Sequence, residues 1–177
     1  MRDDQIATLA IASILGAGVL GSYVPVVKDQ LSKTYDHWLQ IPNDTRYMFY
    51  ALQLLAAIGF ITWTIHYCTR PEPYKSGLFS YSRAFVPILI TVLLLSAIGW
   101  SIGTVLHARR PNKGTAALTS GSLIVTALCS LLLLAGQLES ETPVWYAILG
   151  LLLFCLVTVL GDGVGWNSRF LLGLRKK

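Results

Sequence analysis

Charged side chains are scarce in this sequence, and their scarcity excludes most soluble folds. Asp, Glu, Lys and Arg together make up 13% of the 177 residues, whereas a soluble domain usually carries about 25%. Hydrophobic residues make up 54%, and the mean hydropathy is +0.57. A soluble bundle of this composition would lack the polar surface that water requires, so we expect lipid to be its solvent.

Cysteine and histidine are also few, which makes metal and redox sites unexpected. The three cysteines, Cys68, Cys129 and Cys155, include no Cys-x-x-Cys pair, and a thiol inside an apolar run behaves as a small hydrophobic side chain. The three histidines stand far apart, unlike the clusters of membrane di-iron enzymes. We therefore expect no metal, no cofactor and no catalytic residues, and we interpret the protein as a non-enzyme.

Two long runs, 84–106 and 115–138, contain no acidic or basic residue at all. A helix of about 20 apolar residues crosses a bilayer core roughly 30 Å thick, and in lipid only a helix pairs all the backbone groups of such a segment. Between the runs lies a short basic turn that contains Arg109, Arg110 and Lys113. The pattern predicts a transmembrane hairpin.

Three further apolar runs complete the predicted architecture, at residues 6–27, 47–67 and 144–161. The expected fold class is all-α, a polytopic transmembrane helix bundle of about five spans. The whole chain, 1–177, is expected to form a single membrane domain.

Segment 28–46 connects the first two spans and places Leu31, Tyr35 and Trp38 on one helical face. Aromatic side chains of this kind favour the headgroup region of a bilayer. We therefore predict an amphipathic segment that lies on the membrane surface.

Small residues recur at a spacing of four in the first and third spans. They are Ala12 with Gly16, Ser13 with Ala17 and Gly21, and Gly99 with Gly103. Residues four apart lie on one helix face, and small ones let another helix backbone approach closely. The spacing predicts interhelical packing faces.

Lysine and arginine are divided unequally between the two sides of the predicted bundle. Ten lie on the side of segment 28–46, the hairpin turn and the tail, and four lie on the side of the N-terminus. Positive residues stay on the cytoplasmic side, so we predict the N-terminus outside and the C-terminus inside. The residues expected to contact lipid or partner proteins are Arg109, Arg110, Lys113, Trp38, Arg175, Lys176 and Lys177.

Three glycines, Gly161, Gly163 and Gly165, flank Asp162 and invite comparison with a phosphate-binding loop. A dinucleotide fingerprint needs a strand before it, whereas a membrane span precedes these glycines. We interpret them as the flexible end of the last span, with Asp162 reaching toward the interface. No ionisable side chain would then lie at mid-depth, which counts against a pump or a charge-coupled transporter.

Hydroxyl side chains along 115–138 leave two interpretations open. The residues are Thr115, Thr119, Ser120, Ser122, Thr126 and Ser130. They can bond back to their own helix or to a neighbour, or they can line a passive pore together with Gln53. Gln53 itself is expected to form an interhelical hydrogen bond.

Two stretches carry a resemblance to a known group of proteins. One is Pro42-Asn43-Asp44-Thr45-Arg46-Tyr47-Met48-Phe49-Tyr50-Ala51-Leu52-Gln53 running into Ala56-Ala57-Ile58-Gly59-Phe60, and the other is Leu95-Ser96-Ala97-Ile98-Gly99-Trp100. They resemble multi-pass membrane proteins encoded by large DNA viruses of algae and protists. The resemblance implies a place in the internal membrane of a virion, beneath its icosahedral shell, and it carries over no site residues.

The functional hypothesis is a non-catalytic structural protein, a lipid-embedded subunit of a larger assembly. Its expected partners are the lipid bilayer and neighbouring membrane or capsid proteins, and the resemblance adds a role in anchoring a viral capsid to its internal membrane. No nucleic acid is expected, because the basic residues lie between the spans and not along one groove. No small-molecule substrate is expected either. The alternative is a small channel or transporter.

Overall fold

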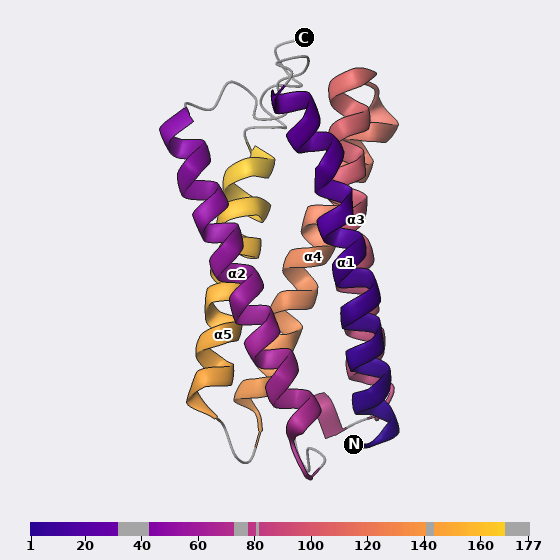
Figure 1. Ribbon diagram of the computed structural model, residues 1–177, viewed down its shortest axis with the longest axis vertical. Helices are drawn as coiled ribbons and strands as arrows, with labels where there is room; N and C mark the ends of the chain where they lie inside the picture. Colours follow the sequence, from indigo (N-terminus) through magenta and orange to yellow (C-terminus); the bar gives the residue numbers. More distant parts are fainter. Residues whose placement is uncertain (32–42, 73–77, 81, 141–143, 169–177) are drawn as a thin grey trace.

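Five long helices make up the part of the chain that the computed structural model describes, residues 1–31, 43–72, 78–80, 82–140 and 144–168 (Figure 1). They are α1 Asp3–Leu31, α2 Asn43–Thr69, α3 Phe85–Arg109, α4 Lys113–Leu138, and α5 Trp145–Cys155 continued by the π-helix η2 Leu156–Trp166. A short 3-10 helix, η1 Leu78–Ser80, precedes α3.

All five helices are long and apolar enough to cross a membrane. The predicted fold class is therefore confirmed, and the protein is a multi-pass integral membrane protein. Large apolar side chains point away from the bundle on every helix, among them Ile14, Leu54, Ile88, Leu128 and Leu152. Such a surface would be unfavourable in water, but it matches the hydrocarbon interior of a bilayer.

The helices run antiparallel, so that successive connections alternate between the two ends of the bundle (Figure 1). α3 and α4 form the predicted hairpin, α2 pairs with α5, and α1 lies chiefly along α3. Asn112 starts α4 with a capping box: its side chain accepts from the backbone N–H of Thr115 at 2.9 Å, and the Thr115 hydroxyl accepts from the backbone N–H of Asn112 at 3.2 Å. These bonds pair donors that a helix start otherwise leaves free.

Four of the helices enclose the main core. Trp63, Ile90, Leu133 and Leu151 come from α2, α3, α4 and α5, and each is 0% exposed. The α2 and α5 backbones approach closely at Gly59 and Gly150. A Cβ atom on Gly150 would lie only 2.7 Å from the carbonyl oxygen of Gly59. The close approach of α2 and α5 therefore requires glycine at both positions.

α1 packs far less completely than the other helices. Only 6% of its most apolar stretch is buried inside the protein, against 39% for each of the other four spans. The helix touches α3 at Gly18, where a Cβ atom would lie 3.1 Å from the side chain of Ile98. Most of its surface is available to lipid or to another protein.

Two segments differ from the expectation or fall outside the structure. The last helix does not end at Gly161; it continues through Trp166 in wider π-helical turns. Trp166 is buried against Trp100 and Leu123, and these contacts hold the glycine-containing segment helical. The structure describes only the two ends of the predicted surface segment 28–46. Its residues 32–42, which include Trp38, lie outside the described residues.

Candidate functional site

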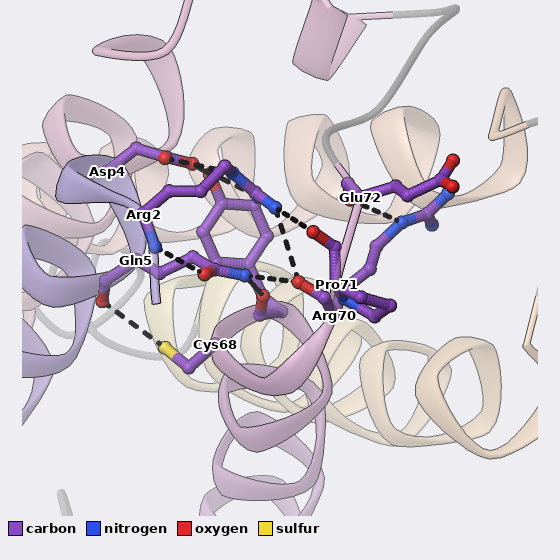
Figure 2. Close-up of polar contacts among 8 residues, drawn as sticks. Arg2, Asp4, Gln5, Cys68, Arg70, Pro71 and Glu72 are labelled. Carbon is purple, nitrogen blue, oxygen red and sulfur yellow. Dashed lines mark hydrogen bonds and ion pairs between the residues drawn. The ribbon is translucent and has the colours of Figure 1, made fainter.

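A cluster of polar side chains joins the start of α1 to the end of α2 (Figure 2). The amide nitrogen of Gln5 donates to the backbone oxygens of Tyr67 at 2.9 Å and Arg70 at 2.7 Å. The last carbonyl groups of a helix have no partner within that helix. Gln5, which is 2% exposed, supplies one from the neighbouring helix.

Arg2 and Asp4 extend this cluster. The Arg2 guanidinium contacts the Asp4 carboxylate at 3.2 Å and donates to the Arg70 carbonyl at 3.2 Å, and the Tyr67 hydroxyl donates to Asp4 at 2.8 Å. A cation beside the C-terminal end of α2 also complements the negative end of its helix dipole. Asp4 is therefore a buried acid with two partners.

Two further hydrogen bonds tie α2 to α4 and α5 at the same end of the bundle. The indole nitrogen of Trp63 donates to the side-chain oxygen of Gln137 at 3.1 Å. His66 Nδ1 lies 3.2 Å from the Tyr146 hydroxyl. We call this region, with Arg2, Asp4, Gln5, Tyr67 and Arg70, the capped end.

The capped end has the chemistry of a structural clamp. The Asp4 carboxylate is paired with Arg2. The side-chain N–H groups of Gln5 and Trp63 donate hydrogen bonds to other elements of the chain. In the described part of the chain, no group of three or more His, Cys, Asp or Glu side chains could hold a metal ion. These contacts hold the ends of the helices together.

The predicted packing glycines of the third span lie on the α3–α4 contact. A Cβ atom on Gly99 would lie 2.8 Å from the Ser122 hydroxyl, and one on Gly103 would lie 2.7 Å from the Thr119 hydroxyl. Both positions lie where α4 approaches closely, so a larger side chain would force the two helices apart.

The small residues of α1 are placed differently. Ala12 packs against the main core, but Ser13, Ala17 and Gly21 are exposed. A Cβ atom on Gly16 or Gly21 would meet no atom of the described chain within 4 Å. The contact with α3 uses Gly18 instead, because the face that approaches α3 is rotated away from the predicted stripe.

The basic residues of the hairpin turn, Arg109, Arg110 and Lys113, are exposed at the opposite end of the bundle. We call this the basic end; α1 finishes and α2 begins there as well (Figure 1). The tail residues Arg175, Lys176 and Lys177 lie outside the described residues.

The hydroxyl side chains of α4 are largely engaged in hydrogen bonds. Those of Thr119, Thr126 and Ser130 donate to backbone oxygens three or four residues earlier in the same helix. Thr126 also pairs with Ser96 of α3 at 2.8 Å, and Ser130 with Thr158 at 2.8 Å. Hydrogen bonds within the same helix and hydrogen bonds to a neighbouring helix, the two patterns expected for packing side chains, are therefore both present.

Asp162 is half-buried in η2, close to the end of the last span at Trp166. A Cβ atom on the adjacent Gly163 would lie 3.5 Å from the side chain of Ala127 on α4. The helix continues past Gly161, so Asp162 belongs to a helix and not to a flexible end of the span.

Aromatic side chains from α1, α3 and η2 pack together in this part of the bundle. Tyr23 contacts the ring of Trp100 at 5.7 Å between centroids, and Trp100 contacts Trp166 at 5.9 Å. Within the described residues, the only ion pair is the one between Arg2 and Asp4 at the far end of the bundle.

A small cavity of about 30 Å³ lies beside the same aromatic groups, between α1, α2 and α3. The polar residues along it are Tyr23, Tyr50, Gln53, Ser101 and Thr104, but the surface that lines the cavity is almost entirely apolar. Gln53 therefore lines a cavity, and the expected interhelical hydrogen bond of its side chain is not formed within the described residues.

Sequence reasoning missed the hydrogen bonds of Gln5 and Gln137. A glutamine at the edge of an apolar run was the available signal for both, because the ends of neighbouring helices leave carbonyl groups to satisfy. Comparison of the chain with known proteins found no matching protein-family model, characterised protein or solved structure.

Proposed function

We propose that the protein is a non-catalytic structural subunit, embedded in lipid and assembled with neighbouring membrane proteins through α1. The observation that supports this proposal is the outward small-residue face of α1, formed by Ser13, Ala17 and Gly21. Lipid chains gain nothing from small residues at regular spacing, whereas a second helix can approach closely and gain van der Waals contact.

Elsewhere in the bundle, small residues lie where helices meet. Gly59 and Gly150 lie at the α2–α5 contact, and Gly99 and Gly103 lie at the α3–α4 contact. α1 carries a comparable face and has no helix of the described chain against it. A partner helix would bury it in the way that these contacts are buried.

The hairpin turn supplies a second contact surface. Arg109, Arg110 and Lys113 project from the basic end, where they suit anionic headgroups or an acidic protein surface. The excess of basic residues on this side supports an orientation with the N-terminus outside and the C-terminus on the cytoplasmic side. The viral resemblance supports a virion's internal membrane as the location and capsid proteins as partners.

Native gel electrophoresis of solubilised membranes, combined with cross-linking mass spectrometry, tests the structural role. Replacing Ser13, Ala17 and Gly21 together with leucine should release the protein from its assembly and abolish cross-links from α1. The control is Gly121→Leu, because Gly121 is exposed on α4 and a Cβ atom there meets nothing within 4 Å. An assembly of unchanged size in the triple variant would reject the proposal.

The alternative, a small channel or transporter, is favoured by Gln53, which lines the small cavity between α1, α2 and α3. Purified protein in liposomes tests it. Solute flux above that of empty vesicles, lost on replacing Gln53 or Ser122, would support transport and contradict a purely structural role. Absence of flux together with stable co-purification in a large assembly would reject transport.

A further inference from the structure

We propose that the hairpin turn between α3 and α4 binds a phospholipid with an anionic headgroup. The headgroup would contact Arg109, Arg110 and Lys113, and the acyl chains would lie along outward apolar side chains of the same two helices. The inference rests on the proposed function and names one of its partners, because it assigns the second contact surface to lipid and not to an acidic protein.

The lengths of the two helices place these basic side chains at the depth of the lipid headgroups. α3 has 25 residues and α4 has 26, so at about 1.5 Å per residue each helix is about 38 Å long. The hydrocarbon core of a bilayer is about 30 Å thick, and the bilayer with its headgroups is about 40–45 Å thick. Arg109 ends α3 and Lys113 begins α4. Both residues therefore leave the hydrocarbon without passing beyond the headgroups.

The turn is short and is held at both ends. Residues 110–112 alone separate the two helices. His107 Nδ1 on α3 lies 2.9 Å from the Thr115 hydroxyl on α4, and the capping box of Asn112 fixes the start of α4. Groups that are already positioned lose less freedom when a ligand binds. The turn thus presents its positive charges as a preformed cluster.

The hairpin contains no negative charge that would offset this cluster. From residue 73 to residue 138 the chain has no Asp or Glu. Arg110 and Lys113 are exposed, and in the part of the chain that the structure describes ion pairing is confined to Arg2 and Asp4 at the capped end. Exposed basic clusters next to membrane spans attract anionic lipids.

Next to the turn, the hairpin offers apolar side chains to the acyl chains. Ile102 and Leu106 precede Arg109 by seven and three residues, so the three lie on one face of α3. Both apolar side chains are 45% exposed, and Leu118 on α4 is 42% exposed. A Cβ atom on Gly103 would lie 3.2 Å from the Leu118 side chain, so Leu118 lies against α3. The hairpin therefore combines a basic end with an apolar surface, as a phospholipid combines an anionic headgroup with hydrocarbon chains.

The depth of the turn also favours lipid over an acidic protein. Lysine and arginine side chains keep their stems along apolar surface and their charged ends in the polar layer. At headgroup depth, lipid phosphates already surround these charged ends. A protein from the aqueous phase would have to displace the headgroups before it could reach the same contacts.

Native mass spectrometry of the solubilised full chain tests the site by titration with phosphatidylglycerol and with phosphatidylcholine of the same acyl chains. We expect the wild type to bind phosphatidylglycerol more tightly. Each basic residue near an anionic surface contributes about fivefold to binding. Arg110→Gln combined with Lys113→Gln should therefore weaken phosphatidylglycerol binding about twentyfold and leave phosphatidylcholine binding unchanged. Arg109 stays in place, because it has a further interaction in the chain.

The matched control is Lys28→Gln combined with Arg83→Gln, which removes the same number of positive charges from exposed residues outside the turn. This variant should keep the lipid preference of the wild type. Equal weakening in the two double variants would overturn the site, because it would show a response to net charge alone. Equal affinity of the wild type for the two lipids would overturn it too, whether or not the variants fold.

Competition with glycerol phosphate tests the contribution of the apolar surface. This molecule carries the phosphate charge without acyl chains, and it should not displace phosphatidylglycerol at equal concentration. Displacement would reduce the site to a phosphate site and overturn the proposed contact with the acyl chains.

Native gels separate this proposal from the assembly through α1. The variant with Ser13→Leu, Ala17→Leu and Gly21→Leu retains the turn, so it should keep the lipid preference whatever happens to its assembly. Arg110→Gln combined with Lys113→Gln should leave the assembly at its normal size. Loss of the assembly in this double variant with unchanged lipid preference would identify an acidic protein as the partner and overturn the lipid site.

Discussion

The two ends of the bundle hold their polar side chains in different ways. At the capped end, Asp4 is bound by Arg2 and Tyr67, and Gln5 pairs the last carbonyls of α2. Toward the basic end, the Ser101 hydroxyl of α3 donates to the backbone oxygen of Ser22 on α1 at 2.8 Å, and Gln53 borders a cavity. A paired carboxylate and the amide of Gln5 thus join helices at the capped end, whereas a hydroxyl group joins α3 to α1 toward the basic end.

The difference follows from where helix ends coincide. The start of α1 meets the end of α2 at the capped end, so donors from one helix reach the unpaired carbonyl groups of the other. Asp162 lies within a continuous helix, where backbone groups already pair with one another. Matched substitutions at the two ends therefore separate clamping residues from residues that serve another role.

The largest difference is expected for glycine. Gly150→Leu should lower the free energy of unfolding by about 3 kcal/mol or more, because the new side chain would overlap the backbone of Gly59. Gly121→Leu should be neutral or stabilising by up to about 1 kcal/mol, since its surroundings are empty. Thermal unfolding in detergent, followed by dye labelling of the three buried cysteines, measures both. Equal losses of stability in Gly150→Leu and Gly121→Leu would show that α2 and α5 do not approach each other closely at Gly150.

Two tryptophans, the buried Trp63 and the half-buried Trp100, should come next. Trp63→Phe removes a hydrogen bond to Gln137 and leaves a void in the main core, at a cost of about 2–4 kcal/mol. Trp100→Phe also loses ring area but removes an unpartnered donor, so we expect about half that cost or less. The same labelling assay applies. A larger loss for Trp100 would mean that its indole nitrogen is firmly bound in the folded protein.

A smaller difference is expected for glutamine. Gln5→Met should destabilise the protein by about 1–3 kcal/mol, because carbonyl groups of Tyr67 and Arg70 lose their partner. Gln53→Met keeps the length of the side chain and should change stability by less than about 0.5 kcal/mol. Comparable losses would place Gln53 in an interhelical contact after all.

The sequence predicted the number and approximate extent of the spans because apolar length alone decides whether a helix can cross a bilayer. It also singled out Gly99 and Gly103, which lie against α4. A spacing of four defines a helix face but not its partner. For this reason Ser13, Ala17 and Gly21 could be grouped from the sequence, while their outward direction could not.

The end of the last helix shows a second limit. Gly161, Gly163 and Gly165 weaken a helix locally, yet the burial of Trp166 against Trp100 and Leu123 keeps the segment helical. This contact joins residues far apart in the chain and leaves no local signal. The helical conformation around Asp162 depends on it, so the continuation of the last helix past Gly161 could not be recognised before the fold was known.

The smallest and most informative difference concerns the two acids. Asp4→Asn weakens the contacts with Arg2 and Tyr67 and should cost about 1–2 kcal/mol. Asp162→Asn should change stability by less than about 0.5 kcal/mol, because the Asp162 side chain forms no hydrogen bond or ion pair within the described residues. Unfolding of both variants by the labelling assay provides the comparison. If Asp162→Asn were the more destabilising, the Asp162 carboxylate would have to be bound to another part of the folded chain, and the acid would be a clamp like Asp4.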